Sequence, residues 1–99
     1  MEIKKNVAGE TLTAEIIGRL DATTAPQLEK ELSGSLGGVK ILILDFKELE
    51  YIASAGLRVL LVFQKRMKKQ GKMTIKNVSE EVKEVLEMTG FINFLNIEE

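Results

Sequence analysis

Alternating apolar and polar residues predict a β-hairpin near the start of the chain. Every second position of residues 11–17 is apolar, at Leu12, Ala14 and Ile16. A period of two is typical of a strand with one buried face. A shorter run over residues 3–7 precedes it, and a turn at Ala8-Gly9 separates the two. Because the connection is short, we expect antiparallel strands at 3–7 and 11–17.

The first helix is predicted to begin at Thr24. Apolar residues recur there at every fourth position, at Leu28, Leu32 and Leu36. This spacing places them on one buried face of a helix. Thr24 and Gln27 have the spacing of a capping box, and Pro26 is tolerated in a first turn. We expect this helix to end at Gly37-Gly38.

Two further helices are predicted from their apolar faces and their end signals. The second spans residues 55–70 and stops at Gly71. Its core face consists of Leu57, Val59, Leu60, Phe63 and Met67. The third begins after Ser79, a residue type favoured at helix starts, and ends at Gly90.

The remaining apolar runs predict strands. Residues 39–46 contain four consecutive apolar residues at 41–44, a pattern that suits a central strand buried on both faces. Residues 73–78 form a short strand, and the apolar tail at 91–95 is a candidate last strand. Strands that are separated by helices pair in parallel through right-handed crossovers.

These elements predict a single α/β domain over residues 1–99. Their order is β-β-α-β-α-β-α, with an optional last strand. The first hairpin contributes one antiparallel strand to an otherwise parallel arrangement. We therefore expect a mixed sheet of four to five strands with three helices.

Composition narrows the classes of function. The net charge is −1, which gives no reason to expect nucleic acid as a partner. No apolar run reaches 18 residues and the first residues lack an apolar stretch, so we expect no membrane insertion and a cytoplasmic protein. The chain has neither His nor Cys, which excludes a Ser-His-Asp triad, a thiol nucleophile and zinc sites built from those residues. Gly34, Gly37 and Gly38 follow a helix instead of preceding one, so no phosphate-binding loop and no cofactor are expected.

Ser54 is the main candidate for chemistry. It lies between a strongly apolar strand and the start of the second helix, where backbone N–H groups lack partners and the helix dipole favours negative charge. One interpretation is an ordinary N-cap, worth about 1 kcal/mol. The other is a phosphorylation site, because a phosphate at this place is stabilised by the helix. With no His or Cys in the chain, another protein must supply the catalytic groups.

The second helix has an outer face that begins at Ser54. Residues four apart stack on a helix surface, so Arg58 lies next to Ser54. Further along this face are Leu61, Val62, Lys65, Arg66 and Lys69. The basic residues suit a solvated face near a helix C-terminus. Apolar Leu61 and Val62 beside the serine are instead typical of a surface that binds a partner.

Two segments of the chain carry a family resemblance. The run from Leu44 to Leu61 reads LDFKELEYIASAGLRVLL, and the segment from Gly18 to Ala25 reads GRLDATTA. The first resembles the signature of the STAS domain, in particular of bacterial anti-sigma factor antagonists, and the second is similar to the Gly-x-Leu-Asp segment before that family's first helix. The resemblance extends over the full length, and the element order agrees with it.

The resemblance implies a non-enzymatic partner switch. Family members bind an anti-sigma factor that is also a serine kinase, and this binding frees a sigma factor. The kinase phosphorylates a serine or threonine at this helix start, and a metal-dependent phosphatase reverses the modification. The matching acceptor is Ser54. We expect partner contacts at Asp21, Thr23, Ala53, Ser54, Ala55, Gly56, Arg58, Leu61, Val62 and Lys65.

Ala53 and Ala55 depart from the family's switch motif, which carries an acidic residue before the acceptor and a second hydroxyl residue after it. The first departure favours an alternative, in which the chain is a non-phosphorylated STAS subunit of a sensory or lipid-transport complex. A third hypothesis is a receiver domain that accepts a phosphoryl group on Asp45. Such a domain needs an acidic pair after its first strand to hold magnesium, and this chain offers Glu10 alone at that place.

Overall fold

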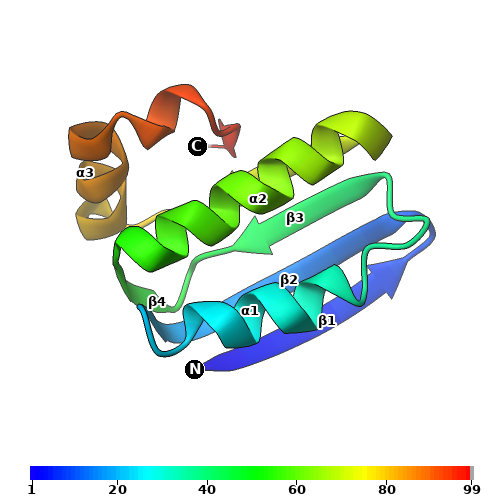
Figure 1. Ribbon diagram of the computed structural model, residues 1–99, viewed down its shortest axis with the longest axis horizontal. Coiled ribbons are helices and arrows are strands. Elements are labelled where there is room, and N and C mark those ends of the chain that lie inside the picture. The colour runs from blue at the N-terminus through cyan, green and yellow to red at the C-terminus, as the bar shows by residue number, and fades with distance from the viewer. Residues whose placement is uncertain (99) are drawn as a thin grey trace.

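In residues 1–98, which the computed structural model describes, six strands form one sheet and are joined by helices (Figure 1). The elements follow in the order β1 (Glu2–Ala8), β2 (Thr11–Leu20), α1 (Ala25–Ser33), β3 (Ile41–Asp45), β4 (Leu49–Ile52), α2 (Ser54–Gln70), β5 (Lys72–Lys76), α3 (Glu80–Thr89), η1 (Phe91–Asn93) and β6 (Ile97–Glu98). The predicted α/β class is confirmed.

The sheet is mixed, as predicted. Its main path runs β1-β2-β3-β5-β6, and β4 pairs with β2 off this path. β1 and β2 are antiparallel, whereas β2–β3, β3–β5 and β5–β6 are parallel. The hairpin and the parallel crossovers are therefore confirmed, while β4 was not predicted.

β2 changes its partner at Gly18. Its first half pairs with β3, and its last residues pair with β4, with a register shift between Gly18 and Arg19. Gly18 has a φ of 104°, a conformation that strongly favours glycine. The change of partner places Leu20 beside Ile52, and thus brings two segments that are distant in sequence together at one end of the sheet.

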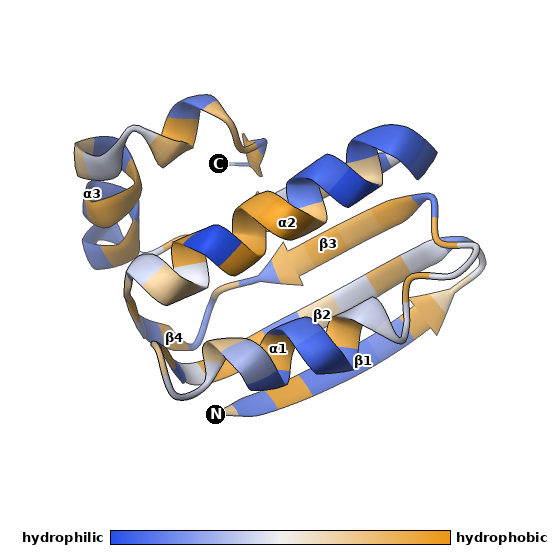
Figure 2. Ribbon diagram, viewed as in Figure 1, coloured by the Kyte–Doolittle hydropathy of each residue, from blue (hydrophilic) through white to orange (hydrophobic). Residues whose placement is uncertain are grey.

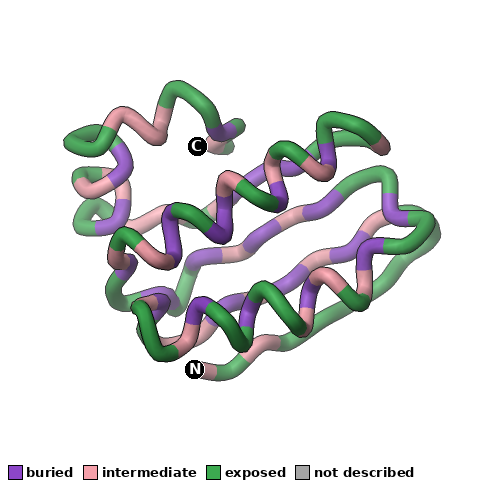
Figure 3. The backbone as a smooth tube through the Cα atoms, viewed as in Figure 1, coloured by how far each residue is buried: buried purple, intermediate pink, exposed green. Residues whose placement is uncertain are grey.

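Both α1 and α2 lie on the same face of the sheet (Figure 1). In β3, Leu42 and Leu44 are fully buried, whereas Ile41 is 41% exposed. Buried and partly exposed positions alternate along the central strands (Figure 3). The prediction that β3 is buried on both faces was wrong. Ile41 and Ile43 pair with Thr11 and Thr13, and these four residues lie on the less buried face of the sheet.

α1 is shorter than predicted. It ends at Ser33, yet Leu36 is fully buried in the turn that follows. Gly71 follows α2 as predicted, but its φ of 173° is extended. A Cβ there would lie 1.8 Å from the Lys40 carbonyl oxygen, so Gly71 is required by close approach of the backbone.

The last elements also differ from the prediction. The apolar tail at 91–95 forms the 3₁₀ helix η1 and a loop, and the last strand begins at Ile97. The predicted ends of α3 are confirmed: Ser79 accepts a hydrogen bond from the Val82 N–H at 3.2 Å, and Gly90 is left-handed. No helix among residues 1–98 combines the length and the hydropathy needed to cross a membrane.

Candidate functional site

Two segments meet at the end of the sheet where β2 pairs with β4. One is the turn that follows Leu20, and the other is the start of α2 after Ile52. The Ala53 N–H donates to the Leu20 carbonyl at 2.9 Å, which fixes the second segment against the first. Asp21 and Ser54 thus follow directly on two hydrogen-bonded strand ends. The two sequence motifs are brought together in space.

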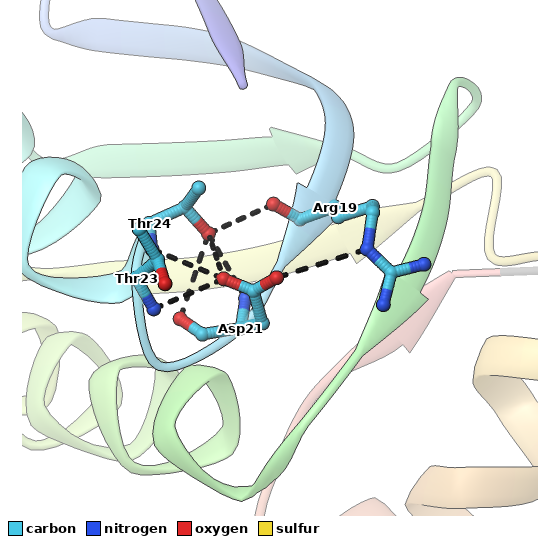
Figure 4. A network of polar contacts seen from close by, with 4 residues as sticks. All are labelled: Arg19, Asp21, Thr23 and Thr24. Carbon is cyan, nitrogen blue, oxygen red and sulfur yellow. Dashed lines mark hydrogen bonds and ion pairs between the residues drawn. The ribbon is translucent and has the colours of Figure 1, made fainter.

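The turn at residues 21–24 is held by a network centred on Asp21 (Figure 4). Asp21 Oδ1 accepts hydrogen bonds from the Thr23 N–H at 3.0 Å and the Thr24 N–H at 3.2 Å. In return, the Asp21 N–H donates to Thr24 Oγ1 at 2.9 Å. The Thr24 hydroxyl donates to the Arg19 carbonyl at 2.8 Å.

The prediction of a capping box at Thr24 and Gln27 was wrong, because Thr24 precedes α1 without a side-chain cap to the helix. The reciprocal pair lies one turn earlier, between Asp21 and Thr24. The residue types fit such a pair, because aspartate and threonine both accept hydrogen bonds from nearby N–H groups.

The carboxyl of Asp21 is held in its charged form. The hydrogen bond from the Thr24 N–H lowers its pKa most, and the Thr23 N–H, the Thr24 hydroxyl and the Arg19 charge lower it further. Burial opposes these effects. Asp21 is therefore a carboxylate at neutral pH and carries negative charge beside the start of α2.

Arg19 was not among the residues expected at the site from the sequence. Its Nε lies 3.7 Å from Asp21 Oδ2, and its guanidinium lies 4.4 Å from the centroid of the Tyr51 ring. The pairing of Arg19 with Tyr51 across β2 and β4 explains the second contact. Arg19 lies within the segment GRLDATTA, which was the one signal for it in the sequence. Its contact with Tyr51 could not be predicted, because strand β4 was not predicted.

Ser54 is the first residue of α2, and Ala53 is the N-cap in an extended conformation. The interpretation of Ser54 as an N-cap was therefore wrong. Its side chain is exposed, and its hydroxyl makes no hydrogen bond to any of residues 1–98. The first hydrogen bond of this helix runs from the Leu57 N–H to the Ala53 carbonyl, so the N–H groups before it point out of the helix start.

Gly56 supports this helix start from beneath. It is buried, and a Cβ at this residue would lie 2.6 Å from Leu20 Cγ and 3.1 Å from Ile52 Cγ1. The first turn of α2 therefore packs directly on the ends of β2 and β4. Gly56 fixes the position of Ser54 instead of offering a surface to a partner.

The outer face of α2 is mixed in character. Arg58, Val62 and Lys65 are exposed and Leu61 is partly exposed. The middle of α2 is hydrophobic, while its last turns are hydrophilic (Figure 2). Arg66 is not part of a freely solvated cluster, because it is partly buried and donates a hydrogen bond to the Ser33 carbonyl at 3.1 Å. That bond joins α2 to the C-terminal end of α1.

Asp45, the acceptor in the receiver hypothesis, stabilises a turn. Its Oδ1 accepts hydrogen bonds from the Lys47 N–H and from Asn77 Nδ2, each at 3.0 Å. Burial raises the pKa of Asp45, but the Asn77 and Lys47 hydrogen bonds and the charges of Lys76 and Lys47 outweigh it and lower the pKa. Within residues 1–98, no three His, Cys, Asp or Glu side chains are grouped so as to hold a metal ion.

A protein-family model and a known relative both match this chain. The STAS domain family model matches residues 2–99. BtrV of Bordetella bronchiseptica, named as an anti-sigma factor antagonist, is 35% identical over 88 residues, covering 87% of this chain and 76% of that protein.

Solved structures share the fold. A Thermotoga maritima protein described as an anti-sigma factor antagonist superposes with a TM-score of 0.90 at 18% identity, over 98% of this chain and 86% of the other. SpoIIAA of Bacillus in its phosphorylated form superposes with a TM-score of 0.75 at 20% identity, over 99% and 92% of the two chains. With the family model matching residues 2–99 and a relative at 35% identity, the chain belongs to the STAS domain family.

Proposed function

We propose that this chain is an anti-sigma factor antagonist, which binds an anti-sigma factor serine kinase and thereby releases a sigma factor. Phosphorylation of Ser54 by that kinase ends the binding, and a metal-dependent serine phosphatase restores it. Relatives that carry the name of antagonist support the partner class. The observation that carries the regulation is the exposed Ser54 hydroxyl, which has no hydrogen-bond partner among residues 1–98.

In this function the chain is a substrate and a binding partner, and not an enzyme. Ser54 Oγ forms the new bond to the γ-phosphorus of ATP, ADP leaves, and the hydroxyl proton passes to a base of the kinase. The chain contains no His or Cys that would activate the hydroxyl. The kinase therefore provides the base and the metal-bound nucleotide.

The start of α2 tolerates the phosphate. Ala53 has no side-chain acceptor, so nothing at the N-cap competes for the free N–H groups of the first turn. A negative group there gains about 0.3–1 kcal/mol from the helix dipole. Phosphorylation therefore blocks binding through its charge and bulk in the interface, and the helix stays folded.

The partner surface in this proposal combines the turn and the outer face of α2. Asp21 and Thr23 lie in the turn after Leu20, whose carbonyl accepts from the Ala53 N–H, and Arg58 lies one helical turn after Ser54. The surface extends over Ala53, Ala55, Leu61, Val62 and Lys65. Such a surface combines exposed or partly exposed apolar residues with charged ones, as protein interfaces do.

Phosphorylation by the cognate anti-sigma factor kinase tests the proposal. The chain has serines at 33, 35, 54 and 79. After incubation with the kinase and ATP, mass spectrometry is expected to find one phosphate, on Ser54. The Ser54→Ala variant is expected to stay unmodified, and Ser79→Ala, as a matched control, to be modified like the native chain. Ser54→Asp is expected to bind the kinase at least about tenfold more weakly than the native chain. Phosphate on another residue would contradict the proposal.

In the alternative function the chain has the same fold and the same partner surface, but Ser54 is not phosphorylated. The alanine at position 53 favours it, because the acidic residue of the switch motif is missing. In that case the chain is an interaction subunit of a sensory or lipid-transport complex. Tight binding to a partner that leaves Ser54 unmodified in the presence of ATP would favour this alternative.

A further inference from the structure

A groove lies between the first turns of α1 and α2. It has a volume of about 290 Å³. Its lining includes Ala25, Pro26 and Glu29 from α1, and Ala55, Arg58 and Val62 from α2. We call this feature the α1–α2 groove. None of the groove residues on α1 was expected at the site from the sequence.

The groove has an apolar floor and two charged sides. Ala25 is buried at its base, while Val62 is 45% exposed at its edge. Glu29 stands on the α1 side and Arg58 on the α2 side, and both are exposed. Neither forms an ion pair with another of residues 1–98. An apolar depression between two unpaired opposite charges matches a partner segment with an apolar side chain between a basic and an acidic residue.

The groove is continuous with the Ser54 site. Ala55, which lines it, directly follows Ser54 in the chain, and Arg58 lies one helical turn after Ser54. A phosphate on Ser54 is therefore within reach of the guanidinium that forms one side of the groove. The groove and the modification share Arg58.

We propose that the α1–α2 groove receives one apolar side chain of the anti-sigma factor, flanked by a basic residue that pairs with Glu29 and an acidic residue that pairs with Arg58. This inference rests on the proposed function. The groove has a volume of about 290 Å³, which is large enough for one apolar side chain of a partner. When Ser54 is phosphorylated, Arg58 pairs with the phosphate and is no longer available to the acidic residue of the partner.

The test compares how a new carboxylate affects the Kd for the kinase when it is placed at the groove and when it is placed at a remote apolar position. Val62→Glu places a carboxylate at the edge of the groove. Met88→Glu is the matched control, because Met88 is an apolar residue on α3 that is 79% exposed. With the cognate anti-sigma factor kinase as the probe, Val62→Glu is expected to raise the Kd by about tenfold or more. Met88→Glu is expected to stay within about twofold of the native chain.

A second measurement does not depend on a charge in α2. The chain has no cysteine, so Val62→Cys and Met88→Cys each accept one bimane label. Addition of the kinase is expected to shift the emission of the label at position 62 to the blue, because the groove is dehydrated, and to leave the label at 88 unchanged.

The outcomes separate this inference from the proposed function. If the native chain binds the kinase and is phosphorylated on Ser54, but Val62→Glu binds as well as Met88→Glu, the groove is not the docking site and the proposed function stands. If both labels respond alike, the groove proposal is again overturned. If the native chain does not bind the kinase at all, the proposed function fails and this inference fails with it.

Discussion

Asp21 and Thr24 satisfy each other's backbone N–H groups. The Asp21 N–H donates to Thr24 Oγ1 at 2.9 Å, and the Thr24 N–H donates to Asp21 Oδ1 at 3.2 Å. This reciprocal pair fixes the turn that leads from β2 into α1. Because the same turn borders the start of α2, the pair also sets the position of Thr23 and of the Asp21 charge relative to Ser54.

Removal of the Thr24 hydroxyl is expected to destabilise the fold. Thr24→Val keeps the shape of the side chain but leaves the Asp21 N–H and the Arg19 carbonyl without this partner. We expect the free energy of unfolding to fall by about 1 kcal/mol. Thr23→Val is the matched control, because the Thr23 hydroxyl bonds to none of residues 1–98, and it should change stability by less than about 0.5 kcal/mol. Urea denaturation measures both. Equal losses for the two variants would show that the reciprocal pair does not hold the turn.

Because the pKa of Asp21 is lowered in the folded protein, we expect the free energy of unfolding to fall in acid. The pKa of Asp21 in the folded protein is lowered from the ordinary value of 3.8, chiefly by the Thr24 N–H. A lowered folded pKa contributes stability that is present above pH 3.8 and is lost as the pH falls through the folded pKa. Asp21→Asn keeps the side-chain acceptor but removes the charge. We expect it to melt below the native chain at neutral pH and to converge with it in acid.

Thermal unfolding over a pH series measures this convergence. Asp45→Asn is the matched comparison, because the pKa of Asp45 is also lowered. The double variant should show the weakest dependence on pH of the four proteins. A difference between native chain and Asp21→Asn that is the same at neutral pH and well below pH 3.8 would contradict the prediction.

Periodicity and end signals predicted most of the fold because they act locally. The buried face of α2, the N-cap at Ser79 and the left-handed Gly90 each follow from residues within a few positions of one another. β4 was missed because it has four residues and its pairing with β2 depends on the bulge at Gly18. The burial of Ile41 was overestimated. The residue type alone does not tell on which face of the sheet a side chain lies; that depends on the strand register and on which face the helices cover.

The sequence singled out the motifs around Asp21 and Ser54 but not the contacts between them. In the structure the Ala53 N–H donates to the Leu20 carbonyl, which brings the two motifs together. The role of Gly56 was not predictable, because it depends on the approach of Leu20 and Ile52 from other elements. Glu29 and Pro26 were not singled out for a related reason: they line the α1–α2 groove only because α1 packs beside α2.

Gly56→Ala tests the close packing beneath Ser54. In an isolated helix this substitution is favourable by about 1 kcal/mol. Here the new Cβ would lie 2.6 Å from Leu20 Cγ, so α2 or Leu20 must move. We expect a net loss of about 1–3 kcal/mol, measured by urea denaturation. Gly37→Ala is the control, because no heavy atom lies within 4 Å of its Cβ position, and it should be neutral or slightly stabilising. A stabilised Gly56→Ala variant would mean that the first turn of α2 is not held against β2 and β4.

Ser54 and Ser79 both stand at helix starts, and the structure predicts opposite consequences of their loss. Ser79 is an N-cap whose Oγ accepts from the Val82 N–H at 3.2 Å, so Ser79→Ala should lower the free energy of unfolding by about 1 kcal/mol. Ser54 follows the N-cap, and its hydroxyl bonds to none of residues 1–98. Ser54→Ala should therefore change stability by less than about 0.5 kcal/mol. Thermal and urea unfolding of the two variants measure this contrast. A loss at Ser54 as large as that at Ser79 would mean that the hydroxyl supports the helix start, and the case for a free acceptor at that position would be lost.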